Sequence, residues 1–208
     1  TSLTKNVHAA EYTYQPEGCD FTVTLPTVPS VSKRCRPGLI NECDLKTTYT
    51  EVFEFTSTVN VYLTCEPIDA KSYQSHNKDT LRTILIALSG GLLETYQADT
   101  NTDNTAYKNG MILGTGYTAN KNLLLYAAQV WVSENSSLIV EAELIGPEQK
   151  DADKTLIDIL HSVQYAGTMP VEPVEAPNPE DTETDNTAGD KPQIVLPPRK
   201  KPEQSAEE

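Results

Sequence analysis

The sequence predicts an α+β fold class: an antiparallel β-sheet with two main helices packed on it, followed by a disordered C-terminal tail. Several long segments alternate apolar with polar residues, which is typical of strands with one buried face. Two other segments repeat apolar residues at helical spacing, and the order along the chain is strands, helix, strands, helix. This order indicates an antiparallel sheet with helices packed against it.

Composition divides the chain into three regions. Residues 1–10 form an arm without clear periodicity, and residues 11–165 carry nearly all the large apolar side chains, so they form one disulfide-stabilised domain. Residues 166–208 hold eight of the 14 prolines and few aliphatic side chains. This composition buries too little apolar surface to offset chain entropy, so we expect the tail to stay extended.

The first part of the domain alternates like a set of strands. Residues Thr22–Leu25 run into Pro26, and Val31–Cys35 is expected to return beside them as a hairpin. Residues Thr47–Phe55 and Val59–Cys65, rich in Thr, Val and Tyr, are expected to form a second hairpin.

A further antiparallel set is expected at residues 107–117, 122–132 and 137–145. The stretch Leu123–Val132 is apolar on both faces, as expected of a central strand that is covered on two sides. The next strand instead alternates apolar residues with Ile139, Glu141 and Glu143. The two neighbouring strands are therefore expected to have different surroundings.

Two segments have the apolar period of an amphipathic helix. Asn77 or Asp79 can cap the first, and Ser89-Gly90-Gly91 stops it. Pro147 opens the second, together with carboxylates that suit the positive end of the helix dipole. The apolar stripes are Leu81, Ile84, Leu85 and Leu88 in the first helix, and Leu156, Ile159, Leu160 and Val163 in the second.

Four cysteines, Cys19, Cys35, Cys43 and Cys65, lie in the first third of the chain. Their spacing matches neither a zinc ribbon nor a thioredoxin-like site, which favours two disulfides in an oxidising compartment over free thiols or a metal. Strand alternation puts Cys19 and Cys65 on apolar faces, so we favour a Cys19–Cys65 bridge with Cys35–Cys43 closing a loop. A Cys19–Cys35 bridge is the alternative. Each bridge is expected to add ~2–4 kcal/mol of stability.

The chain is acidic, with a formal net charge of −14. Such a surface repels phosphate backbones and anionic headgroups, which disfavours nucleic acid and membrane surfaces as direct partners. No apolar run approaches the roughly 20 residues of a membrane-spanning helix. The chain begins at Thr1 without an initiator Met, which fits removal of a signal peptide as well as recombinant production. We therefore expect a periplasmic or secreted protein.

The closing strand, strand, helix unit, from Gly114-Thr115-Gly116-Tyr117 to Gln164, resembles the PsbP-like fold of photosystem II extrinsic proteins and their bacterial relatives. The resemblance covers about Glu11–Gln164 and rests on the order of elements. It implies a small accessory or assembly protein without catalytic machinery. It assigns no functional residue, and the four cysteines match no pattern of that family.

One loop has the oxygen spacing of a calcium site, with Asp99, Asn101 and Asp103 at positions 1, 3 and 5. Asn104 replaces the usual glycine at position 6, and Gly110 stands where a bidentate Glu is needed. A polar connector between the first helix and the next strand is the alternative, since Asp and Asn are ordinary loop residues. Calcium is the one cofactor that the sequence suggests.

Residues 193–201 form an apolar and basic patch in the otherwise acidic tail. An extended segment of this type can add to a sheet edge or lie in a groove of a partner. The alternative is a solvated chain end with a few chance aliphatic residues. The candidate partner-binding residues are Ile194, Val195, Leu196, Pro197, Pro198 and Arg199.

The sequence contains no Gly-x-Ser-x-Gly, His-Glu-x-x-His or Walker motif. Gly110, Gly114 and Gly116 fall in an expected strand, where a bulge or close packing against another backbone explains them better than a phosphate loop. Asn135-Ser136-Ser137 is a glycosylation sequon on a turn, which matters only in a eukaryotic secretory pathway.

The sequence therefore favours a non-enzymatic accessory or scaffold protein of an extracytoplasmic, envelope-associated assembly. Its partners would be other proteins, contacted through the sheet surface and the tail. Two alternatives stay open: a ligand- or calcium-binding module, and an enzyme whose site is assembled from scattered Asp, Tyr and Ser residues.

Overall fold

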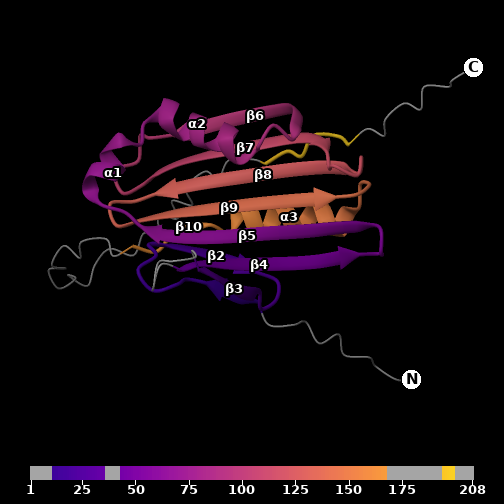
Figure 1. Cartoon of the computed structure of the whole chain (residues 1–208), viewed down its shortest axis with the longest axis horizontal. Helices are drawn as coiled ribbons and strands as arrows, with labels where there is room; N and C mark the ends of the chain where they lie inside the picture. The colour runs from indigo at the N-terminus through magenta and orange to yellow at the C-terminus, as the bar shows by residue number, and fades with distance from the viewer. Residues whose placement is uncertain (1–10, 36–42, 168–193, 200–208) are drawn as a thin grey trace, which may run out of the picture.

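The computed structural model describes residues 11–35, 43–167 and 194–199, without the side chains of residues 33–35 and 43–45. Its strands form a seven-stranded antiparallel sheet, in the order β3-β4-β5-β9-β8-β7-β6, and a three-stranded sheet, in the order β1-β2-β10 (Figure 1). The strands are β1 (Tyr12–Tyr14), β2 (Phe21–Leu25), β3 (Ser30–Cys35), β4 (Cys43–Phe53), β5 (Ser57–Pro67), β6 (Leu93–Asn101), β7 (Lys108–Tyr117), β8 (Leu123–Val132), β9 (Ser136–Ile145) and β10 (Gln164–Tyr165). The helices are α1 (Ala70–Ser75), α2 (Lys78–Leu88) and α3 (Lys150–His161).

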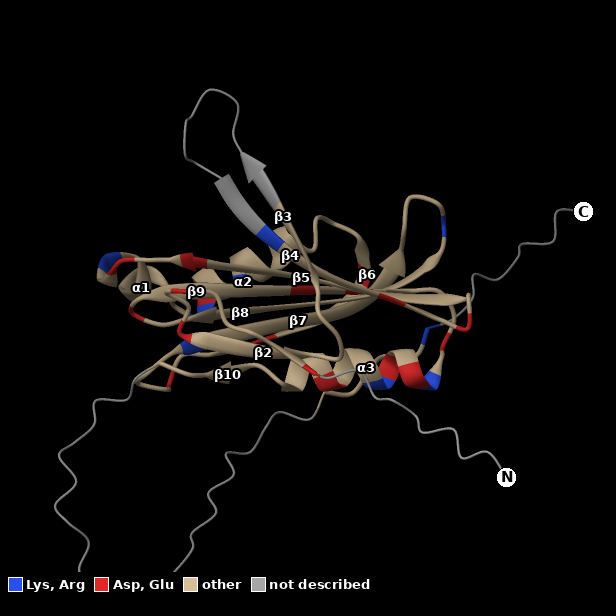
Figure 2. Cartoon of the chain, turned by 90° about the horizontal axis from the view of Figure 1, so that it is seen from below, with Lys and Arg blue, Asp and Glu red and all other residues tan. Residues whose placement is uncertain are grey.

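Helices α2 and α3 pack on opposite faces of the large sheet (Figure 2). On one face α2 contacts β6, β7 and β8. On the other face α3 contacts β5 and β9, and β2 of the small sheet packs against α3. The predicted α+β fold class, with an antiparallel sheet and helices packed on it, is thus confirmed.

Side-chain alternation divides the interior into two buried clusters, one on each face of the sheet. In β8, Leu125 and Ala127 face the α3 side, whereas Leu124, Tyr126 and Ala128 face the α2 side. Strand β8 is therefore buried on both faces, as its apolar sequence predicts. Its neighbour β9 strictly alternates buried with half-buried residues, so only its α3 side is fully covered.

The two main helices begin at polar side chains that accept backbone N–H groups. Asn77 Oδ1 accepts the N–H of Thr80 at the start of α2, which decides between the two predicted caps. Gln149 Oε1 accepts the N–H of Ala152 at the start of α3. Asp151 and Asp153 lie in the first turn of α3, where carboxylates interact favourably with the helix dipole.

One predicted pairing is wrong. Strand β3 pairs with β4, whereas β2 pairs with β1 and β10 in the small sheet, so residues 22–25 and 31–35 form no hairpin. Alternation identifies each segment as a strand but does not identify the strand with which it pairs. The pairing depends on which other segments of the chain can pack against its apolar side chains.

The segment expected as a polar connector after the first helix is mostly a strand, β6, at the edge of the large sheet. The glycines of β7 allow β6 to lie close. A Cβ on Gly114 would stand 2.4 Å from the carbonyl oxygen of Thr95, and one on Gly116 would stand 1.9 Å from that of Leu92. Close packing against another backbone, one of the two explanations offered for these glycines, therefore holds.

Within the described residues, no helix combines the length and the apolar character that crossing a membrane requires.

Candidate interaction surface

In the described part of the chain, no helix packs on the α2-side face of β4, β5 and β9, since α2 packs mainly against β6, β7 and β8. We call this surface the open face. Its strands are in register across the sheet, so its side chains form continuous cross-strand rows. The open face consists of Thr48, Thr50 and Val52 from β4, Thr58, Asn60, Tyr62 and Thr64 from β5, and Ile139, Glu141, Glu143 and Ile145 from β9.

Two carboxylates occupy the middle of the open face, each beside a tyrosine. Tyr126 of β8 donates its O–H to Oε1 of Glu141 at 2.9 Å. Burial, and then the charge of Glu141, raises the pKa of Tyr126 well above its usual value. Burial also raises the pKa of Tyr62, with smaller contributions from the charge and hydrogen bond of Glu143. Tyr126 therefore stays a protonated donor and holds Glu141 in place, while Tyr62 lies beside Glu143.

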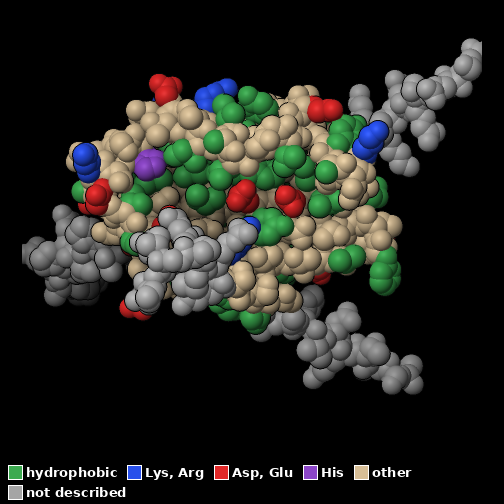
Figure 3. Space-filling view, viewed as in Figure 1, with side chains coloured by type: hydrophobic (Ala, Val, Ile, Leu, Met, Phe, Trp, Pro, Cys, Tyr) green, Lys and Arg blue, Asp and Glu red, His purple; other side chains and the backbone are tan. Residues whose placement is uncertain are grey.

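Other polar contacts order the β4–β5 part of the face. The ammonium group of Lys46 lies 4.1 Å from the centroid of the Tyr62 ring, in cation–π geometry. The Thr50 hydroxyl donates to Oδ1 of Asn60 at 2.9 Å. Figure 3 shows acidic side chains set among hydrophobic ones in the middle of this side of the molecule.

The turn between β4 and β5, at one end of the open face, carries an exposed aromatic side chain. Phe55 is 100% exposed, and nearby Val52 is 56% exposed. Phe55 has a φ of 57° and Glu54 a φ of 48°, the left-handed region that bulky residues rarely adopt. Thr56 donates its backbone N–H to the carbonyl oxygen of Phe53 at 3.0 Å, so the two positive φ values belong to the hairpin turn. The turn holds the phenyl ring in solvent, away from both buried clusters.

In the described residues no group of three or more His, Cys, Asp or Glu side chains is placed to hold a metal ion. His76 caps α1, with Nδ1 2.6 Å from the carbonyl oxygen of Ser72, and His161 ends α3. His8 lies outside the described residues. The residues of the open face supply hydrogen-bond donors, acceptors and apolar groups, which suits binding.

The structure contains the Cys19–Cys65 disulfide that strand alternation favoured, and not the alternative Cys19–Cys35 bridge. It joins the segment before β2 to β5, which fastens the small sheet to the large one. The backbone of Cys35 pairs directly with that of Cys43 across the β3–β4 ladder. Facing positions of an antiparallel ladder lie at a separation that suits a disulfide. The side chains of these two residues are outside the described ones, so the second bridge stays a prediction.

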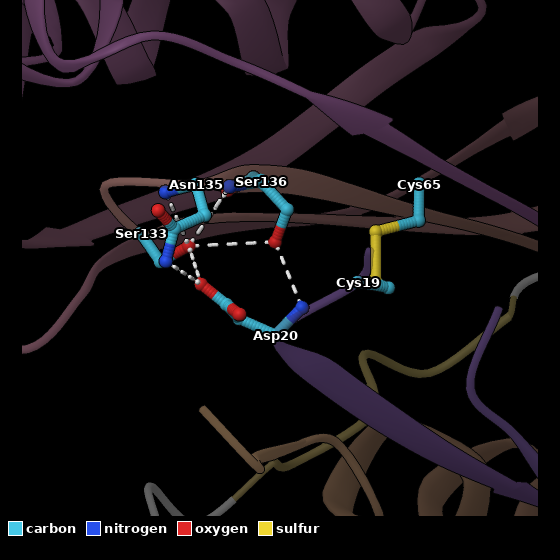
Figure 4. Close-up of a disulfide and its surroundings, with 6 residues drawn as sticks. All are labelled: Cys19, Asp20, Cys65, Ser133, Asn135 and Ser136. Carbon is cyan, nitrogen blue, oxygen red and sulfur yellow. Dashed lines mark hydrogen bonds between the residues drawn. A yellow bond between two sulfur atoms is a disulfide. The ribbon is translucent and has the colours of Figure 1, made fainter. Parts of the chain in front are cut away.

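A partly buried hydrogen-bond network lies beside the disulfide (Figure 4). Asp20 Oδ2 accepts the Ser133 hydroxyl at 2.6 Å and Nδ2 of Asn135 at 3.1 Å, and its backbone N–H donates to the Ser136 hydroxyl at 2.9 Å. The network ties the start of β2 to the β8–β9 turn. It also occupies the side-chain nitrogen of the predicted sequon.

The proposed calcium ligands are exposed and lie near the edge of the sheet. Asp99 and Asn101 belong to β6, and Asp103 follows it. Oδ1 of Asn101 accepts the backbone N–H of Asp103 at 3.0 Å, and the Asp103 carboxylate lies 3.8 Å from the ammonium group of Lys78. Calcium binding at these residues stays a prediction.

Part of the predicted partner-binding segment, residues 194–199, packs against its own domain. Ile194 joins the buried cluster on the α3 side and Leu196 packs against it, while Arg199 pairs with Asp153 of α3. The sequence did not indicate this intramolecular contact. Binding of an external partner by Ile194, Val195, Leu196, Pro197, Pro198 or Arg199 stays a prediction. Most of the tail and residues 1–10 lie outside the described residues.

These features define a disulfide-bonded, acidic α+β protein with one open sheet face. No protein family model and no curated protein matches the chain. Among solved structures, the Ran-binding protein Mog1p of Saccharomyces cerevisiae aligns with a TM-score of 0.37 and 9% identity, over 76% of this chain and 97% of Mog1p. LpqN of Mycobacterium tuberculosis, involved in cell envelope biogenesis, aligns with a TM-score of 0.34 and 12% identity, over 75% of this chain and 90% of LpqN. Neither is a photosystem II protein, and the specific resemblance to PsbP stays a prediction.

Proposed function

We propose that this chain is a non-enzymatic accessory or scaffold protein that binds another protein through its open face. The observation that carries the proposal is Phe55, which stands fully exposed on a backbone of positive φ at the end of that face. Aromatic residues are enriched among the few side chains that supply most of the binding energy of an interface. An exposed phenylalanine contributes nothing to the core of this domain, so a partner is the simplest reason for its position.

The rest of the open face complements such an anchor. Val52, Ile139 and Ile145 add apolar area around the polar row, and Lys46 lies over the ring of Tyr62. Glu141 accepts the Tyr126 hydroxyl, and in the described part of the chain neither Glu141 nor Glu143 has an ion pair with a cationic side chain. A matching partner therefore presents an apolar pocket for Phe55 and basic groups opposite the two carboxylates.

The proposed location is extracytoplasmic, in the periplasm or outside the cell, with an envelope-associated assembly as the partner. The Cys19–Cys65 disulfide supports this, because disulfides persist in oxidising compartments and are rare in reducing ones. The net charge of −14 disfavours nucleic acids and anionic lipid surfaces and leaves proteins as the expected partners.

Site-specific photo-crosslinking in the cells that make the protein tests the proposal. A photoreactive amino acid replaces Phe55, Thr50 or Asn60 on the open face, or Ile86 on the outer side of α2 as the matched control. We expect the first three positions to crosslink to the same protein and position 86 to give no such product. Once purified, that protein should bind the wild-type chain and the Ile86→Ala variant equally, and Phe55→Asn at least tenfold more weakly.

The proposal fails if the open-face positions give no common crosslinked protein, or if Phe55→Asn binds the purified partner as tightly as the wild type.

A further inference from the structure

The C-terminal segment packs on the domain through alternate side chains. Ile194 is 7% exposed and belongs to the α3-side cluster, Val195 is 70% exposed, and Leu196 again packs against the cluster. Among the described residues, no backbone hydrogen bond joins residues 194–199 to the rest of the chain. The segment is therefore held by its side chains and not as an added strand, which is how a groove recognises an extended peptide.

Arginine 199 fixes the far end of the segment. The Arg199 side chain is 1% exposed, and its Nη2 donates to Oδ1 of Asp153 in the first turn of α3. Its Nη1 is also buried and has no hydrogen-bond partner among the residues that the structure describes. A buried guanidinium nitrogen without a hydrogen bond costs free energy. The contact between the tail and the domain is therefore weaker than one in which every guanidinium nitrogen is bonded.

Open space remains beside this contact. A shallow, open depression of about 540 Å³ adjoins Asp153 and is lined by Glu148, Gln149, Lys150, Asp153, Lys154 and Ile157. A segment that extended past the arginine would find room and further polar groups there.

The covalent connection makes the tail a strong competitor for its own site. Residues 168–193 separate Gly167, which is still bonded to the domain through Asp20, from Ile194. Because the segment belongs to the same chain, its effective concentration at the site is on the order of millimolar, so an intramolecular contact with a dissociation constant well below that value stays occupied.

We infer that the surface around Asp153, where residues 194–199 lie, is a peptide-binding site that the tail occupies in cis. We call it the tail site. Its external ligand is an extended segment of another protein with two aliphatic residues at i and i+2 and an arginine at i+5, the pattern of Ile194, Leu196 and Arg199. Binding of that ligand displaces the tail. The tail site and the open face lie on opposite faces of the sheet, so either proposal stands without the other.

A protease site placed within residues 178–185 tests the inference on the complete chain. The protein is folded first and then cut, and a fluorescent peptide corresponding to residues 191–201 is added. We expect the peptide to exchange with the released fragment and to bind the cut protein at least tenfold more tightly than the uncut protein, because the tethered tail no longer competes. Fluorescence anisotropy measures both affinities.

Matched variants separate recognition from general attraction. A peptide with Arg199→Leu, or a cut protein with Asp153→Asn, should bind at least tenfold more weakly. A peptide with Val195→Thr and a cut protein with Asp151→Asn should bind like the wild type, since Val195 faces solvent and Asp151 is an exposed carboxylate on the same turn.

Two results overturn the inference. In the first, the cut protein keeps its circular dichroism spectrum but binds the peptide no better than the uncut chain, or binds the Arg199→Leu peptide equally well. In the second, the cut protein unfolds once the fragment leaves, which would make the segment part of the core and not a ligand.

Discussion

Strands β8 and β9 lie side by side in the same sheet, yet they differ in how they are covered. Along β8 nearly every side chain is buried, because α2 packs on one face and the α3-side cluster on the other. Along β9 every second side chain stays partly exposed, because α2 does not reach it. Burial of both faces is explained by folding alone. An uncovered face of an antiparallel sheet can simply meet water. The proposal that this face binds a partner therefore rests on the exposed Phe55 at its end.

The largest effect is expected on the covered side, where the Cys19–Cys65 disulfide joins the two sheets. Replacing both cysteines by serine should lower the free energy of unfolding by about 4 kcal/mol, since the bridge closes a loop with a sequence separation of 46. Urea denaturation of the wild type and the double variant measures the difference. An unchanged midpoint would show that the small sheet is held without the bridge.

A pair of facing residues measures the difference between the two strands directly. Leu124 of β8 and Ile145 of β9 pair across the ladder on the α2 side, but Leu124 is buried and Ile145 is only partly so. Leu124→Ala should cost about 3 kcal/mol and Ile145→Ala about 1 kcal/mol, because the cost follows the buried volume that is lost. Equal losses in urea denaturation would mean that the open face is as well packed as the α2-covered one.

The pH dependence of stability reports on the tyrosine that borders the open face. The pKa of Tyr126 is raised above its ordinary value of 10.0 by burial and by the charge of Glu141. Above pH 10 the unfolded chain therefore loses a phenolic proton that the folded chain keeps, so the free energy of unfolding falls as the pH rises. We expect a shallower fall in Tyr126→Phe than in the wild type or in Tyr96→Phe, an exposed control on β6. If the free energy of unfolding falls equally steeply with pH in Tyr126→Phe and in the wild type, Tyr126 does not have a raised pKa in the folded protein.

The smallest effect concerns calcium. Titration calorimetry with calcium chloride should give heat only in the millimolar range, because Asp99, Asn101 and Asp103 are exposed. The glycine usual at position 6 and the bidentate Glu usual at position 12 are also missing. Asp103→Asn should abolish that heat. A wild-type chain that releases none would remove the calcium hypothesis.

Many of the strands and helices that pack in the core could be predicted from the sequence, because the spacing of apolar residues indicates which side of each element is buried. The two-sided apolar run of β8, the alternation of β9 and the two helical stripes each state which faces are buried. The same alternation placed Cys19 and Cys65 on inward faces.

The rest depends on contacts between distant segments, which no local pattern encodes. Strand β2 pairs with β10, more than a hundred residues away, instead of with its neighbour β3. Strand β6 was not predicted from the sequence, because it is a mostly exposed edge strand with few apolar residues. The sheet surface was predicted as a contact area, but the strands that stay uncovered were not, because the alternation of β5 does not tell whether a helix packs on its second face. Phe55 was assigned to the end of a strand, because nothing in the local pattern shows that its side chain is exposed.

The most direct test of the open face is a paired measurement on Phe55→Asn, with urea stability and partner affinity determined on the same preparation. Asparagine adopts a positive φ more easily than phenylalanine, so we expect the free energy of unfolding to stay the same or to rise by about 0.5–1 kcal/mol. Affinity for the partner identified by crosslinking should fall at least tenfold. A variant that is less stable, or that binds as tightly as the wild type, would contradict the claim that this face is kept open for binding.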